Sequence, residues 1–139
     1  MKPTLGFLLL TRDIIQDSLS SEITAVRIYD TLFILPGRNE LIYPVSVVGR
    51  LYLNMEGMIS DAQAKLKITD PDGDEMGDGQ LLTGKNIQGN IGMNLVCRAW
   101  PLVFTKVGKY KLDVYLSTDG GASFNDVGSP LYFQVVKLT

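Results

Sequence analysis

Acidic side chains crowd one short segment of the chain, and they are the residues most suited to chemistry. They are Asp70, Asp72, Asp74, Glu75 and Asp78. Calcium prefers such oxygen ligands and takes six to eight of them. An EF-hand loop counted from Asp70 requires glycine at its sixth position and glutamate at its twelfth, where this chain has Glu75 and Leu81. The run Pro71-Asp72-Gly73 is instead typical of a hairpin turn with solvated acids, so we expect no tight calcium site here.

Several catalytic designs are excluded because the chain contains no histidine. Without an imidazole there is no Ser-His-Asp triad, no Cys-His pair and no histidine-ligated zinc. Cys97 is the only cysteine, and its alternation with Ile91, Met93 and Leu95 predicts a buried, unreactive thiol. We therefore predict no cofactor and no catalytic residue. A carboxylate-based enzyme stays an alternative, because pairs of acids are brought together only by the fold.

Apolar and polar residues alternate along much of the chain, which is the period of a half-buried β-strand. The alternation is clearest over 45–54, 62–69 and 110–117. Further strands are expected at 4–11, at 22–35 with a break near Asp30, at 90–98 ending with Trp100-Pro101, and at 131–138, with turns that include 18–21. The residues expected to face inward are Val47, Leu51, Leu66, Ile68, Met93, Leu95, Leu112, Val114 and Phe133.

These strands predict an all-β fold in a single domain over 1–139. Specifically, we expect a two-sheet antiparallel sandwich, immunoglobulin-like or C2-like, with seven to eight strands and almost no helix. Gly108 lies two residues before Tyr110 at the start of a strand. That spacing is typical of a sandwich corner in which the tyrosine hydroxyl bonds a nearby backbone group.

A second local pattern predicts a structured turn. The segment 117–124 resembles the Asp-box of sialidase-type propellers, which folds a hairpin turn and is not itself catalytic. The resemblance implies that Asp119 caps backbone amides and that Gly120 and Gly121 take unusual φ angles. One copy in a chain of this length cannot make a propeller, whose blades would repeat the pattern.

Three tyrosines are candidates for an interaction surface. The alternation places Tyr52 and Tyr115 outward, and Tyr132 joins them if Phe133 faces the core. We expect the strands that carry them to share one sheet, so that the rings form one patch suited to a protein partner. The alternative is ordinary cross-strand packing on a solvated face.

Composition narrows the range of partners. The 139 residues are 45% hydrophobic and 20% charged, as in a globular domain, and the net charge of −2 comes without the basic run that nucleic-acid binding requires. No apolar run has the length of a membrane helix, and a single cysteine is more typical of the cytoplasm than of a small secreted domain. We expect a cytoplasmic protein that binds another protein or itself, with no nucleic-acid or membrane partner.

Four segments carry a wider resemblance. They are 6–10 with Arg12-Asp13, 25–30, 69–73, and 107–110 leading into Leu112 and Val114. Through them the chain is similar to an uncharacterised family of small bacterial all-β proteins. The resemblance implies a sandwich and brings no activity or site residue.

Three functional hypotheses follow from these patterns. The first is a non-enzymatic interaction or structural module of bacterial or phage origin. The second is a ligand-binding module with a calcium site in the acidic loop 70–78, as in C2-type sandwiches, with Asp70, Asp72, Asp74 and Asp78 as candidate ligands. The third is the carboxylate-based enzyme.

Overall fold

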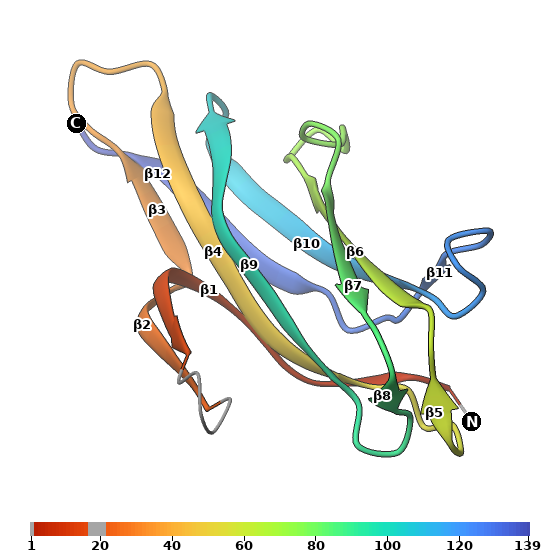
Figure 1. Cartoon of the computed structure of the whole chain (residues 1–139). Coiled ribbons are helices and arrows are strands. Elements are labelled where there is room, and N and C mark those ends of the chain that lie inside the picture. The colour runs from red at the N-terminus through yellow and green to blue at the C-terminus, as the bar shows by residue number, and fades with distance from the viewer. Residues whose placement is uncertain (1, 17–21) are drawn as a thin grey trace.

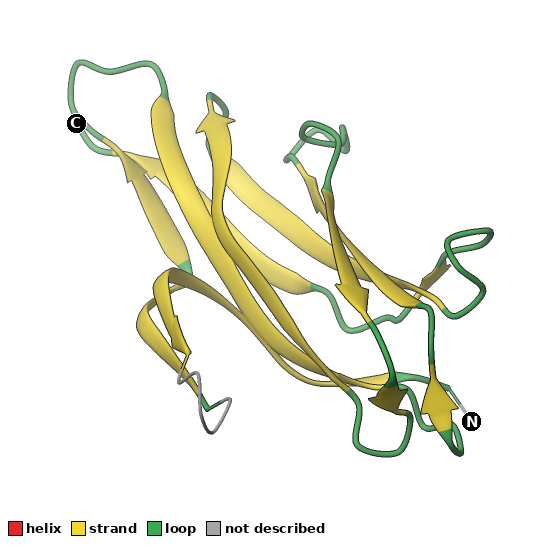
Figure 2. Ribbon diagram, viewed as in Figure 1, coloured by secondary structure: helices red, strands yellow, loops and turns green. Residues whose placement is uncertain are grey.

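The computed structural model describes residues 2–16 and 22–139, and none of these residues is helical (Figure 2). The all-β class is confirmed, whereas the expected turn at 18–21 lies outside the described residues. The described residues form twelve strands: β1 (Thr4–Gln16), β2 (Ile23–Tyr29), β3 (Thr31–Ile34), β4 (Leu41–Tyr52), β5 (Met58–Ile59), β6 (Ala62–Thr69), β7 (Gln80–Gly84), β8 (Ile87–Gln88), β9 (Met93–Phe104), β10 (Gly108–Ser117), β11 (Asn125–Asp126) and β12 (Leu131–Lys137). Four of them, β5, β7, β8 and β11, were not expected from the sequence because they are too short to show a period.

Two sheets form the sandwich (Figure 1). The first has the order β2-β1-β4-β9, and the second has the order β3-β12-β10-β6-β7 with β11 added to β10. β5 and β8 make a separate two-stranded ribbon. The described part of the chain contains no helix that could cross a membrane.

One pairing departs from the expected antiparallel arrangement. β3 runs parallel to β12, while the other pairs of named strands are antiparallel. The chain bends at Asp30, where it leaves the first sheet and reaches the edge of the second beside the last strand. The break expected near Asp30 is therefore the point at which the chain changes sheets.

The core lies between the two sheets and contains the residues that the alternation placed there. All nine expected core residues are at most 5% exposed. Two further aromatic rings pack with Phe133, which is one of the nine: Phe104 and Tyr110 meet edge to face at 5.3 Å, and Tyr110 stacks on Phe133 at 5.4 Å. Such pairs stabilise the core beyond the area that they bury.

β9 is longer than the sequence predicted. Trp100 and Pro101 do not end it, because a bulge interrupts its register with β4 at Ala99, whose φ is 52°, and the strand then continues to Phe104. Trp100 remains buried at 4% exposure. Ile91, expected on the core face, is 55% exposed because it lies in the turn that precedes the strand.

Two prolines lie opposite each other in the first sheet. Pro44 of β4 pairs with Pro101 of β9. Proline has no N–H, so this cannot be a pair that exchanges hydrogen bonds, and both ring nitrogens face away from the partner strand. β1 pairs β4 only from Ser46 onward, so each proline lies on an edge without a neighbouring strand. Proline on an exposed edge hinders the addition of further strands.

Both local patterns are confirmed. The Tyr110 hydroxyl donates to the Lys106 carbonyl at 2.7 Å, which fixes the corner before β10. In the turn after β10, the Asp119 carboxylate accepts the Ser123 amide at 3.0 Å and the Ser123 hydroxyl at 2.6 Å. Gly120 and Gly121 have φ angles of 73° and 92°.

Candidate functional site

The acidic loop between β6 and β7 is closed around a lysine. Lys106 Nζ lies 2.9 Å from Asp70 Oδ2, 2.8 Å from Asp72 Oδ2 and 3.9 Å from Asp74 Oδ2. Asp70 Oδ1 also accepts the amides of Asp72 and Asp74, at 2.9 and 3.0 Å. The hydrogen bond from Lys106 is the largest cause of a lowered pKa at Asp70, and its acidic partners raise the pKa of Lys106.

Lys106 therefore takes the place that a cation would have among these three carboxylates. Asp78, the fourth candidate ligand, is exposed and does not contact Lys106. Within 2–16 and 22–139, no group of three or more acidic, cysteine or histidine side chains is arranged to hold a metal ion. Since Lys106 is far from this loop in sequence, the sequence of the loop alone could not predict its ion pairs with Lys106.

The three candidate tyrosines do not form one patch. Tyr52 belongs to β4 in the first sheet, whereas Tyr115 and Tyr132 belong to β10 and β12 in the second. The expectation that β4 and β10 share a sheet is wrong. The alternation of apolar and polar residues shows which face of a strand is buried, but it does not show which strands pair with one another. The Tyr52 ring already makes contacts within its own sheet. It packs so closely on Gly6 that a Cβ added there would lie 2.6 Å from the ring, and the Arg50 guanidinium lies 5.6 Å from the ring centre.

Tyr115 and Tyr132 lie instead among lysines on the outer face of the second sheet. Lys65 and Lys67 come from β6, and Lys109 and Lys111 come from β10. The strand register places them on one face with the two tyrosines, since Tyr115 is opposite Lys65 and Tyr132 is opposite Lys111. We call this surface the basic face, defined by Lys65, Lys67, Lys109, Lys111, Tyr115 and Tyr132.

Aromatic rings hold three of these ammonium groups. Lys109 Nζ lies 4.1 Å from the centre of the Tyr132 ring, and Lys67 Nζ lies 4.9 Å from that of Tyr115. Lys65 Nζ lies 5.9 Å from the centre of the Phe124 ring. These are cation–π distances, at which each ring attracts the ammonium group beside it. A hollow of about 310 Å³ lies beside Lys109 and Tyr132, so this face is not flat.

Acidic groups neutralise only part of the basic face. Asp113 is 5% exposed and lies 3.4 Å from Lys111, and Glu75 lies 3.8 Å from Lys67. Burial raises the pKa of Asp113, an effect that the Lys111 charge opposes. Lys65 and Lys109 form no ion pair with any described residue. The sequence signal for this face was the pattern Lys-x-Lys, which occurs at 65–67 and at 109–111 on neighbouring strands.

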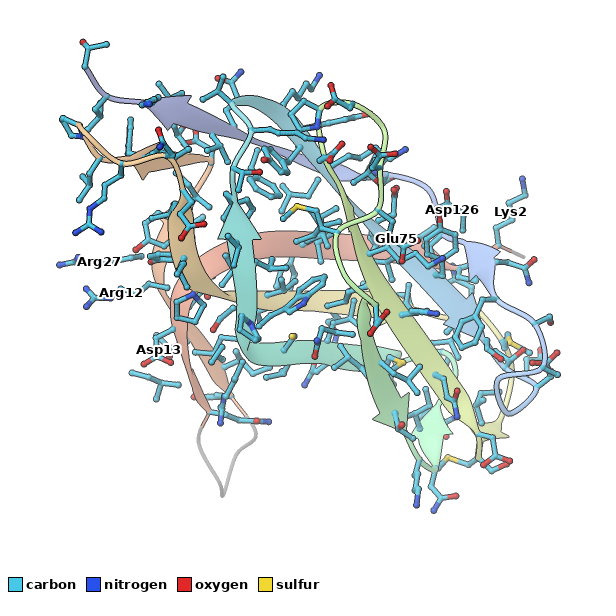
Figure 3. All side chains as sticks on the ribbon, turned by 90° about the horizontal axis from the view of Figure 1, so that it is seen from above. Lys2, Arg12, Asp13, Arg27, Glu75 and Asp126 are labelled. Carbon is cyan, nitrogen blue, oxygen red and sulfur yellow. The ribbon has the colours of Figure 1, made fainter. Side chains whose placement is uncertain are left out.

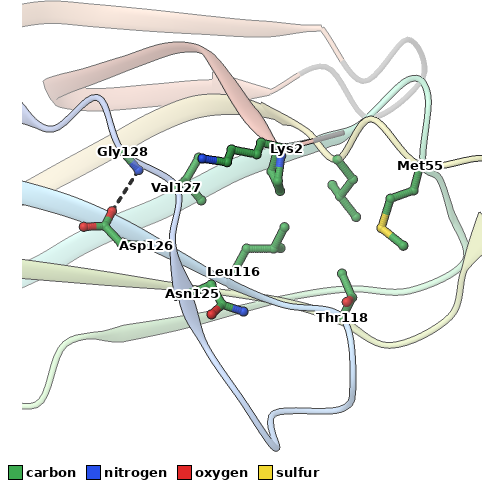
Figure 4. A pocket seen from close by; sticks show the side chains of 10 residues that line it. Lys2, Met55, Leu116, Thr118, Asn125, Asp126, Val127 and Gly128 are labelled. Atoms are coloured by element: carbon green, nitrogen blue, oxygen red, sulfur yellow. Dashed lines mark hydrogen bonds between the residues drawn. The ribbon is translucent and has the colours of Figure 1, made fainter.

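A cavity of about 650 Å³ opens at one end of the sandwich (Figure 4). Its apolar side chains include Leu53, Leu116 and Val127, and Lys2 and Asp126 supply charges at the rim. The Asp126 carboxylate also accepts the Gly128 amide at 2.8 Å, which shapes the segment after β11. This volume is in the range of small-molecule sites.

Neither a family model nor a curated protein matches the chain. Among solved structures, the chain is similar to the soluble domain of PmoD from Methylocystis sp. ATCC 49242 (Rockwell). The identity is 12% and the TM-score 0.32, over 95% of this chain and 96% of that one. It is also similar to a family 123 glycoside hydrolase from Clostridium perfringens, at 13% identity and a TM-score of 0.31. That match covers 98% of this chain and spans 28% of the hydrolase. Scores this low carry no functional argument, and the resemblance to a bacterial family stays a prediction.

Proposed function

We propose that this chain is a non-enzymatic interaction module, of bacterial or phage origin and cytoplasmic, that binds an acidic protein surface through the basic face. The observation that carries the proposal is the concentration of charge. Four of the thirteen Lys and Arg residues lie on one face of two adjacent strands, in a chain whose net charge is −2. Such a field attracts an acidic partner and orients its approach.

The aromatic rings support a protein partner. Tyr132 is 48% exposed, and its ring presents a rigid apolar surface beside the Lys109 ammonium. Tyrosine is enriched at protein interfaces because a large contact area is gained with little loss of conformational freedom. Lysines already held against rings lose less freedom when a carboxylate binds them.

The strand order supports an immunoglobulin-like topology for the module. β12, β10, β6 and β7 occur in the order of strands G, F, C and C′ of a variable-type domain, and β4 and β9 correspond to strands B and E. The Tyr110 corner lies at the start of the strand that corresponds to F, as in that fold. The chain departs from the antibody pattern because its single cysteine, on β9, cannot form the disulfide between B and F.

Isothermal titration with poly-L-glutamate as the acidic probe tests this proposal. The variant Lys65→Glu/Lys109→Glu changes two lysines that have no ion pair to lose. It removes their cation–π contacts with Phe124 and Tyr132, which are worth only about 0.5 to 1 kcal/mol each at an exposed site, so the fold should persist. We expect at least about a tenfold loss of affinity, and wild-type binding that weakens between about 0.05 and 0.5 M salt. Lys85→Glu, in the exposed segment before β8, is the matched control and should bind like the wild type. Equal affinities for all three proteins would refute the proposal.

The end cavity supports a second candidate, a small-molecule-binding module. Its apolar walls and charged rim are the features of a site for an amphipathic ligand. Val127→Trp should fill the cavity and remove the enhanced fluorescence of an anilinonaphthalene sulfonate dye. A dye signal that is unchanged in this variant would exclude the cavity as a binding site.

A further inference from the structure

A pair of arginines lies at the end of the first sheet where β1 and β2 continue as a pair beyond the last contact of β1 with β4. The ladder pairs Thr11 with Ile28 and Asp13 with Val26, which sets Arg12 opposite Arg27. Both are exposed, and Figure 3 shows the two side chains projecting together from the same side of the molecule. Like charges directly opposite each other in a ladder are destabilising.

Neither arginine has an acidic partner among the residues that the structure describes. Asp13 is the acid next to Arg12 in sequence, and its Oδ1 accepts the Ile14 amide at 2.8 Å. Arg27 also has a φ of 55°, a conformation that residues other than glycine rarely adopt. Backbone strain of this kind is concentrated at binding and active sites, and a bound anion would balance the two positive charges.

Two tyrosine hydroxyls lie within the field of these arginines. The Tyr43 hydroxyl donates to the Tyr29 hydroxyl at 2.7 Å, and the rings meet edge to face with centres 5.8 Å apart. Burial and the contact with Tyr29 raise the pKa of Tyr43 to about 12, and the charges of Arg12 and Arg27 oppose this shift. Tyr29 therefore accepts a hydrogen bond while its own hydrogen is available, so it can donate to an anion.

The same two tyrosines border an apolar hollow of about 210 Å³ between β3 and the part of β4 that β1 leaves unpaired. Leu32, Phe33 and Leu41 supply its other apolar walls. A cavity of about 150 Å³ is enough to take up benzene. The hollow is thus sized for one aromatic ring or a short alkyl chain.

We propose that Arg12, Arg27, Tyr29 and the adjoining hollow form a binding site for a small carboxylic acid with an aromatic or short alkyl body. The guanidinium fork matches the two oxygens of a carboxylate, and the phenol of Tyr29 supplies a third donor. The ring or alkyl body occupies the hollow against Phe33 and Leu41. This site uses none of the residues of the basic face or of the end cavity.

Isothermal titration with benzoate tests this site, with inorganic phosphate and benzyl alcohol as parallel probes. We expect saturable binding of benzoate, with phosphate and benzyl alcohol each at least about tenfold weaker. Phosphate has no apolar body to fill the hollow, and benzyl alcohol has no carboxylate for the arginines to bind. Arg12→Gln and Arg27→Gln should each lower benzoate affinity about tenfold, and Tyr29→Phe should lower it severalfold. Arg98→Gln, an exposed arginine of β9, is the matched control and should leave binding unchanged.

Thermal unfolding without ligand provides the second readout. Replacing either arginine of the pair removes a like-charge contact, so the Tm of Arg12→Gln and of Arg27→Gln should equal or exceed that of the wild type. The proposal is overturned if benzoate does not bind. It is also overturned if phosphate binds as tightly as benzoate, or if Arg98→Gln weakens benzoate binding as much as the other two variants.

Discussion

Removing one hydroxyl at the corner before β10 measures how much that corner contributes to the stability of the sandwich. Tyr110 is 1% exposed, and its hydroxyl donates to the Lys106 carbonyl at 2.7 Å. Tyr110→Phe keeps the ring contacts with Phe104 and Phe133 and removes only this hydrogen bond. Its effect therefore reports the energy of the corner and not that of the core.

The expected loss of unfolding free energy is about 1 to 2 kcal/mol, since an acceptor loses its donor while water can still reach the half-buried Lys106. The entropy of unfolding is about 2.1 cal/mol/K per residue, so 139 residues give about 0.3 kcal/mol/K. Dividing the first value by the second predicts a fall in Tm of about 3 to 7 °C.

Scanning calorimetry measures the Tm, and urea unfolding with an unchanged slope confirms that the native state is altered and the unfolded state is not. Tyr115→Phe is the matched control, because Tyr115 lies on the same strand and its hydroxyl makes no hydrogen bond in the described structure. Its Tm should stay within about 1 °C of the wild type. If Tyr110→Phe and Tyr115→Phe have the same Tm, the corner contributes nothing and the reasoning is wrong.

Three further predictions concern an edge, a thiol and a turn. Pro101→Val restores an N–H on the free edge of β9, so sedimentation should show more self-association than in the wild type; an unchanged monomer fraction would contradict the edge argument. Burial raises the pKa of the Cys97 thiol to about 11, so iodoacetamide near neutral pH should label the folded protein far more slowly than the urea-unfolded protein, and equal rates would contradict its burial. Hydrogen bonds from Ser117 and Ser123 lower the pKa of Asp119, so the carboxylate stabilises the fold above the unfolded pKa of about 3.9 and loses this effect as the pH falls below it. Asp119→Asn should therefore lower the Tm near neutrality by an amount that shrinks on acidification, and a difference independent of pH would exclude this role.

The alternation of apolar residues was enough to place the core, because a one-residue error in register would have exposed the whole set. Leu66 and Ile68 are fully buried, while Lys65 and Lys67, which alternate with them, reach solvent. The corner at Tyr110 and the turn at Asp119 were also predictable, since each depends on contacts between residues close in sequence.

Features that depend on distant contacts were not predictable in this way. The assignment of β4 and β10 to different sheets separates Tyr52 from Tyr115, and no local pattern reports which strands pair. The closing of the acidic loop by Lys106 and the meeting of Arg12 with Arg27 likewise arise from chain reversals. The bulge at Ala99 was not predicted, because a sequence such as Trp100-Pro101 is typical of the end of a strand.

Chemical-shift mapping of backbone amides tests the central proposal most directly, because it locates a bound acidic partner without altering the protein. Titration of the labelled chain with poly-L-glutamate should shift amides in β6, β10 and β12, most strongly near Lys65, Lys109 and Tyr132. The shifts should disappear at high salt, as expected for a contact made by lysines. Shifts confined to the first sheet, or shifts that persist unchanged at high salt, would contradict binding at the basic face.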